Sequence, residues 1–141
     1  MPKQIIYRQN DRVRDWVGRM VAEDDFGNSV AIGLEEDGQL IAGVVYNLYT
    51  KAGISMHVAA VPGKRWMTRD YLYACFAYPF LTARCHRVTG LVREDNLAAQ
   101  KFDEHLGFKR EGLIRMGCED GTNMILYGML RSECRWLEIN K

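Results

Sequence analysis

The spacing of apolar residues changes several times along the chain. Val13, Val17 and Met20 recur at the three- and four-residue intervals of a helix that buries one face. Residues 29–36 instead alternate apolar and polar positions, which predicts a strand with one buried face. Residues 68–84 are apolar on too many faces for a surface helix, so we expect a largely buried helix there.

These patterns predict one α/β (α+β) domain that spans residues 1–141. A strand, a helix and a strand over residues 53–93 should form a parallel, right-handed unit, whereas the flanking hairpins are antiparallel. The predicted sheet is therefore mixed. Strands are expected at residues 4–8, 29–36, 39–50, 53–61, 86–93, 108–116 and 122–131. Helices are expected after residue 10 and at residues 68–84, 95–106 and 132–138.

Four residues mark the expected helix ends. Asn10 and Thr68 stand where N-caps are preferred. Pro79 lacks the N–H that a helix interior needs, so it should bend or end its helix. Gly107 follows the predicted third helix at the position that favours left-handed backbone.

Composition and charge narrow the class of protein. The net charge is +1, with 19 basic and 18 acidic residues, so a nucleic-acid partner is not indicated. The N-terminal segment has no apolar core of a signal peptide, and no apolar run is long enough to span a bilayer. The four cysteines form no C-x-x-C pair and no metal-ligand pattern, which predicts free thiols in a cytoplasmic protein without a bound metal.

The stretch from Asn96 to Phe108, N-L-A-A-Q-K-F-D-E-H-L-G-F, is followed by K-R-E-G. A helix that ends in G-F and leads into a strand opening K-R-E-G resembles the second half of the GCN5-related N-acetyltransferase (GNAT) family, and its ribosomal-protein and antibiotic N-acetyltransferase branch in particular. The resemblance implies a mostly antiparallel sheet of about seven strands, with a central splayed parallel pair and helices on both faces. It also implies acetyl-CoA as acyl donor, bound between strands 53–61 and 86–93.

Two readings of the Asn96 side chain stay open, a plain N-cap or a group that faces a ligand. Phe108 is expected in the core. The resemblance implies that the helix contacts the donor through Asn96, Ala99 and Phe102.

The turn V-P-G-K-R-W-M-T, residues 61–68, corresponds to the family's phosphate-binding loop. Backbone N–H groups at a helix N-terminus suit an anion, although Trp66 and Met67 replace the family's glycines. Lys64 and Arg65, with Arg69 beyond the turn, either pair with phosphate oxygens or remain solvated cations. In this part of the chain the donor-binding residues are predicted to be Val58, Ala60, Val61, Lys64, Arg65, Trp66, Met67, Thr68 and Arg69.

Amine acylation needs a base, because an alkyl ammonium does not attack a thioester. His57, in mid-strand, is the first candidate, and a core histidine held by a neighbour is the alternative. Glu111 and the pair at 35–36 are weaker candidates. The family often places a tyrosine on the late helix as acid for the leaving thiolate; this chain has Asp103 there, and Tyr127 is the substitute candidate. Backbone N–H groups near 58–61 should hold the oxyanion.

Three classes of function follow. The first is an N-acyltransferase that moves an acetyl group from acetyl-CoA directly to a primary amine, whose identity the sequence does not give. The second is a catalytically degenerate CoA-binding or regulatory module, and the third, disfavoured by charge, is a nucleic-acid-associated protein. Acceptor specificity should reside in loops 22–28, 49–53 and 117–122. The C-terminal helix should pack on the sheet or on a partner subunit, which would make a homodimer; no membrane partner is expected.

Overall fold

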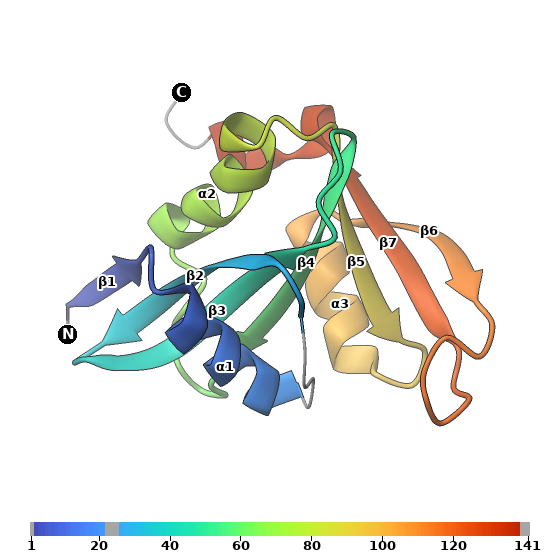
Figure 1. Ribbon diagram of the computed structural model, residues 1–141, viewed down its shortest axis with the longest axis horizontal. Coiled ribbons are helices and arrows are strands. Elements are labelled where there is room, and N and C mark those ends of the chain that lie inside the picture. Colours follow the sequence, from blue (N-terminus) through green and yellow to red (C-terminus); the bar gives the residue numbers. More distant parts are fainter. Residues whose placement is uncertain (1, 22–25, 139–141) are drawn as a thin grey trace.

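Seven strands form one sheet in the computed structural model, which describes residues 2–21 and 26–138. The strand order is β1-β2-β3-β4-β5-β7-β6, and only β4 and β5 are parallel. The sheet is therefore mixed and mostly antiparallel, as predicted (Figure 1). The strands are β1 (Lys3–Ile6), β2 (Ser29–Glu36), β3 (Gln39–Asn47), β4 (Gly53–Ala60), β5 (Arg87–Arg93), β6 (Lys109–Ile114) and β7 (Met124–Leu130).

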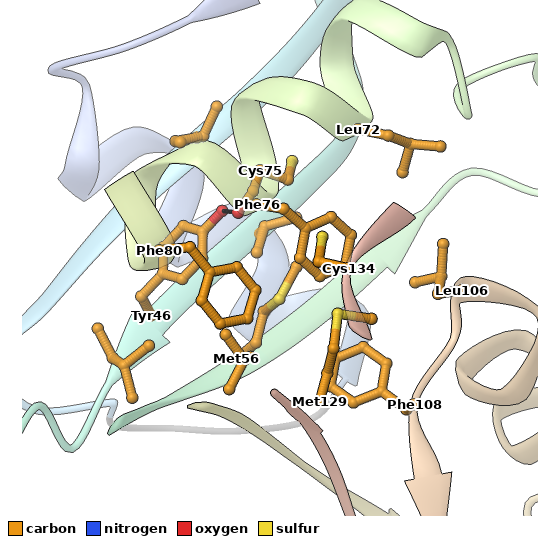
Figure 2. Close-up of a cluster of buried hydrophobic side chains, with 14 of the residues drawn as sticks. Tyr46, Met56, Leu72, Cys75, Phe76, Phe80, Leu106, Phe108, Met129 and Cys134 are labelled. Carbon is orange, nitrogen blue, oxygen red and sulfur yellow. Dashed lines mark hydrogen bonds between the residues drawn. The ribbon is translucent and has the colours of Figure 1, made fainter. Parts of the chain in front are cut away.

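Helices cover both faces of this sheet. The helix α1 (Asn10–Val21) places Val13 and Val17 against one face. The helices α2 (Arg69–Ala77) and α3 (Leu97–Leu106) lie on the opposite face, over the larger core cluster. Figure 2 shows part of that cluster, including Tyr46, Met56, Phe76, Phe80, Phe108 and Met129.

The α-helix ends at Ala77, two residues before Pro79, as predicted, and the chain continues in a wider turn. A π turn, Tyr78–Thr82, follows α2 directly, and the N–H of Ala83 donates to the carbonyl of Tyr78 at 2.8 Å. The wider turn accommodates a residue without an N–H because Pro79 lies in its first positions.

The C-terminal segment forms two short 3-10 turns, Arg131–Glu133 and Arg135–Glu138, instead of one helix. Trp136 and Leu137 pack against the larger core cluster of their own chain, and the indole N–H of Trp136 donates to the carbonyl of Leu106 at 2.7 Å. Of the two readings of this segment, packing on its own domain is the one observed.

The parallel pair is joined over only part of its length. Gly53, Ile54 and Ser55 of β4 pair with Arg87, Val88 and Thr89 of β5, and no further pairs follow. Figure 1 shows the carboxyl ends of β4 and β5 pointing away from each other. The splayed pair that the resemblance implied is therefore present at the centre of the sheet.

Among the described residues, no helix is long and apolar enough to cross a membrane.

Candidate functional site

Beyond Ser55, the edge of β4 that faces β5 is unpaired, and we call the gap between the two strands there the divergence. Backbone groups of β4 line this edge. The N–H of Val61 donates to the carbonyl of Ile41 on β3 at 2.8 Å. Because neighbouring residues of an antiparallel strand point alternately to either side, Val58 and Ala60 direct their N–H groups toward β5. Beyond Ser55 no β5 residue pairs with them. Within the predicted range 58–61, the N–H of Val61 is therefore taken up by β3, whereas Val58 and Ala60 have the orientation that an oxyanion site needs.

The turn that leads from β4 to α2 ends in a capped helix. The hydroxyl of Thr68 accepts the N–H of Tyr71 at 3.2 Å, which confirms Thr68 as the N-cap. The N–H groups of Met67, Arg69 and Asp70 have no hydrogen-bond partner in the described part of the chain. Unpaired donors at the positive end of a helix dipole can bind an anion.

Three cations surround this helix N-terminus, and they differ in their partners. Lys64 Nζ lies 3.1 Å from Glu36 Oε1, and Lys3 also pairs with that carboxylate. These two ammonium groups hold the pKa of Glu36 below its usual value. Arg65 and Arg69 are exposed and have no ion-pair partner among residues 2–21 and 26–138. Two of the three predicted phosphate ligands are therefore available to an anion.

Trp66 links the turn to α3. Its ring centroid lies 5.3 Å from that of Phe102 and 6.3 Å from that of Tyr71. The contact with Phe102 crosses from the β4 side of the divergence to the helix that follows β5. Five of the predicted donor-binding residues share one environment, since all are partly buried against the same core cluster: Val58, Ala60, Trp66, Ala99 and Phe102. Met67 remains exposed.

Asn96 acts as an N-cap. Its side-chain oxygen accepts the N–H of Ala99 at 3.1 Å, with the rest of the residue exposed. Of the two readings of Asn96, the capping role is the one observed. The amide –NH₂ group has no hydrogen-bond partner in the described structure.

His57 lies on the opposite face of β4 from Val58 and Ala60, toward α1. Its Nε2 lies 2.8 Å from the side-chain oxygen of Asn47 on β3, and its ring is 5.0 Å from that of Phe26. The amide nitrogen of Asn47 donates to the carbonyl of Phe26 at 3.0 Å, which fixes the amide. Because Asn47 then offers its oxygen, His57 Nε2 is the protonated nitrogen of the neutral ring.

Glu111 forms an ion pair instead of standing alone. Arg87 Nη2 lies 2.8 Å from Glu111 Oε1, across the strand β7. Arg87 is the residue that pairs with Gly53 at the closed end of the parallel pair. The carboxylate is thus held at the end of the strands where they are still joined, and its role as a base stays a prediction.

Tyr127 is buried on β7, and its phenol donates to Glu104 Oε2 at 2.7 Å. Burial, together with the nearby carboxylate of Glu104, raises the pKa of Tyr127 to about 12. The proton is therefore held more firmly than in a solvated tyrosine, and the phenol already has an acceptor. Its role as the acid stays a prediction.

Known proteins share the fold of this chain. No family model and no curated protein sequence matches the chain. A spermidine N-acetyltransferase SpeG chimera from Vibrio cholerae and hSSAT superposes with a TM-score of 0.74 at 14% identity, over 94% of this chain and 98% of that one. The chain has the GNAT fold.

Two other solved structures extend the likeness. A dodecameric spermidine N-acetyltransferase from Vibrio cholerae in an intermediate state has a TM-score of 0.74 at 12% identity, over 98% of this chain and 96% of that one. A structure described as a probable acetyltransferase, with no organism given, has a TM-score of 0.66 at 17% identity, over 87% and 70%. The GNAT fold is thus shared over nearly the whole chain, and the ribosomal-protein branch stays a prediction.

One residue of the site, Asn47, was not predicted from the sequence. Asn47 is 8% exposed and orients the predicted base. A single amide at the end of an otherwise apolar strand was the available signal, because a buried amide needs partners. The four residues 22–25 of the expected acceptor loops lie outside the described residues. Among the described residues, no cluster of three or more His, Cys, Asp or Glu side chains could hold a metal ion.

Proposed function

We propose that this protein is an N-acyltransferase that moves an acetyl group from acetyl-CoA to a primary amine without a covalent enzyme intermediate. The observation that carries the proposal is the early end of pairing between β4 and β5, beside a helix N-terminus with unpaired N–H groups. The diphosphate would lie at that N-terminus, near Arg65 and Arg69. The pantetheine arm would run along the open side of β4.

The chemistry then needs only the residues already described. The N–H of Val58 or Ala60 would hold the thioester oxygen as negative charge develops on it. His57, on the other face of β4, would accept the ammonium proton directly or through water, with Asn47 fixing the ring. Donor and acceptor would thus approach from opposite faces of the sheet.

A panel assay tests the proposal. The protein is incubated with acetyl-CoA and one primary amine at a time, and the free thiol that is released is measured. Spermidine belongs in the panel because several of the similar structures are spermidine N-acetyltransferases, as do small aminoglycosides and peptides with a free α-amine. We expect amine-dependent thiol release for at least one class. Release that is equal with and without every amine would contradict the transferase assignment.

A second candidate is a module that binds CoA without catalysis. It is favoured by the engagement of two predicted catalytic groups, Glu111 with Arg87 and Tyr127 with Glu104. Binding of acetyl-CoA without thiol release from any amine would support this module. An assembly of several copies is part of either proposal, since one similar protein is a dodecamer, and size-exclusion chromatography with light scattering tests it.

A further inference from the structure

The carboxyl group of Asp103 lies where the parallel strands separate. Its Oδ2 is 3.2 Å from the position that a Cβ on Gly90 would occupy. Gly90 directly follows Thr89, the last residue of β5 that pairs with β4. Since glycine has no side chain, α3 brings this carboxyl group close to the β5 backbone at the first unpaired position.

Glu104 and Glu111 each have a hydrogen-bond or ion-pair partner, and Asp103 differs from them in this respect. Among the described residues, no hydrogen bond or ion pair involves its carboxyl group. The neighbouring Glu104 accepts a hydrogen bond from the phenol of Tyr127. The positive charge of Arg110 on β6 acts to lower the pKa of that phenol. In the described part of the chain, no cation lowers the pKa of Asp103. A half-buried carboxylate without a partner is unfavourable, so the group tends to hold a proton.

The surroundings of Asp103 set a pKa at which the carboxyl group can act as an acid near neutral pH. Burial, and secondly the charge of Glu104, raise the pKa of Asp103 to about 7. The other titratable group that faces it, Tyr127, has a pKa of about 12 and already donates to Glu104. A CoA thiol resembles that of cysteine, with a pKa of about 8.5, so a carboxylic acid near 7 can protonate the thiolate.

We propose that Asp103 is the catalytic acid of the acyl transfer and gives its proton, directly or through one water, to the departing CoA sulfur. The inference rests on the proposed function. The amine nitrogen forms a bond to the thioester carbon, the carbon–sulfur bond breaks, and its electron pair goes to sulfur. Asp103 protonates that sulfur, while the nitrogen loses one proton to His57 or water. The amide and the thiol leave, and solvent returns the proton to Asp103.

The proposed role of Asp103 differs from what the sequence suggested at this position. An aspartate in place of the family's tyrosine suggested a lost acid. The structure places a carboxyl group of suitable pKa there, against a glycine that leaves room for it. Tyr127, the other acid candidate, is the weaker one because its phenol already donates to a carboxylate.

The test uses the whole protein and the amine that gives most thiol release. Asp103→Asn keeps the size of the side chain and removes the acid. We expect its acetyl-CoA affinity, measured by calorimetry, to stay within about threefold, and its kcat at pH 7 to fall at least about tenfold. The decline of the wild-type rate above pH 7 should be absent from the variant. Asp103→Glu should recover part of the rate and regain that decline.

A matched variant on the same helix separates an acid from a structural residue. Glu104→Gln removes a charge that raises the Asp103 pKa, so the alkaline limb of the rate profile should move to lower pH while remaining present. An Asp103→Asn variant with the wild-type rate and profile would overturn the inference and leave the proposed function standing. A wild-type protein that binds acetyl-CoA and releases no thiol with any amine would overturn both.

Discussion

The ring of Trp66 lies 5.3 Å from the ring of Phe102, which connects the turn after β4 to the helix after β5. This contact bridges the two sides of the divergence at the place where donor binding is proposed. The packed indole also holds the turn in which Trp66 and Met67 stand in place of the family's glycines.

A double-mutant cycle measures this contact. We expect Trp66→Ala and Phe102→Ala each to lower the free energy of unfolding by about 1–3 kcal/mol, because both rings are only partly buried. The coupling between them should be about 0.5–1.5 kcal/mol, as for aromatic pairs elsewhere. Urea unfolding of the four proteins gives the value. Strictly additive losses would mean that the rings do not stabilise each other.

The Thr68 cap should be detectable both in stability and in donor binding. Thr68→Ala removes the acceptor of the Tyr71 N–H and should cost about 1 kcal/mol. It should also weaken acetyl-CoA binding, since the first turn of α2 then frays at the proposed phosphate site. Thr68→Ser, which keeps the hydroxyl, is the control. Equal melting temperatures for the two variants would contradict the capping role.

His57 should matter for the chemical step and little for donor affinity, because it faces away from Val58 and Ala60. We expect His57→Ala to lower kcat by about 100-fold or more, with acetyl-CoA affinity unchanged. Asn47→Ala should give a smaller loss, since the ring remains but loses its orientation. An unchanged kcat in His57→Ala would exclude this histidine as the base.

The raised pKa of Asp103 also predicts how stability depends on pH. The folded protein holds this proton up to about pH 7, whereas an ordinary aspartate releases it near 3.8. Between these values the folded state binds more protons than the unfolded state, so stability falls as pH rises through that window. The full effect has an upper bound of about 4 kcal/mol, and partial exposure reduces it to about 1–3 kcal/mol.

Thermal melts of wild-type protein and Asp103→Asn test that dependence. The variant lacks the penalty, so its melting temperature relative to wild type should be higher at pH 8 than at pH 4. Glu119→Gln, which changes an exposed carboxyl group, is the control and should show no such trend. A constant difference between Asp103→Asn and wild type at both pH values would contradict the raised pKa.

Local rules were enough to predict much of the fold from the sequence. Thr68 and Asn96 cap their helices, and Gly107 adopts the left-handed conformation with φ of 110°, because each role depends on neighbours within a few residues. All seven strands were also predicted, residues 29–36 from the alternation of their apolar positions. Tertiary contacts decided the exceptions. The side chain of Asn10 accepts the N–H of Ala31 on β2 at 3.0 Å, a partner that helix-capping rules do not consider.

The site was harder to predict because its chemistry depends on register and burial. The ion pair of Glu111 with Arg87 requires the order β5-β7-β6, which no local pattern encodes. The state of Asp103 depends on Gly90 lying opposite, 13 positions earlier in the sequence. Within the range 58–61, strand alternation turns the N–H of Val61 toward Ile41, and only the register shows which N–H groups of the range face β5. In each case the sequence gives the residue type, but only the tertiary structure gives the residue that it contacts.

Calorimetric titration of the protein with acetyl-CoA tests the central claim most directly. We predict saturable binding at a single site with Kd below about 1 mM, weakened at least about tenfold when Arg65 and Arg69 are both changed to alanine. Changing the exposed Arg131, at the joined end of the strands, should leave the affinity unaltered. Absence of binding, or equal affinity in the double variant, would contradict donor recognition at the start of α2.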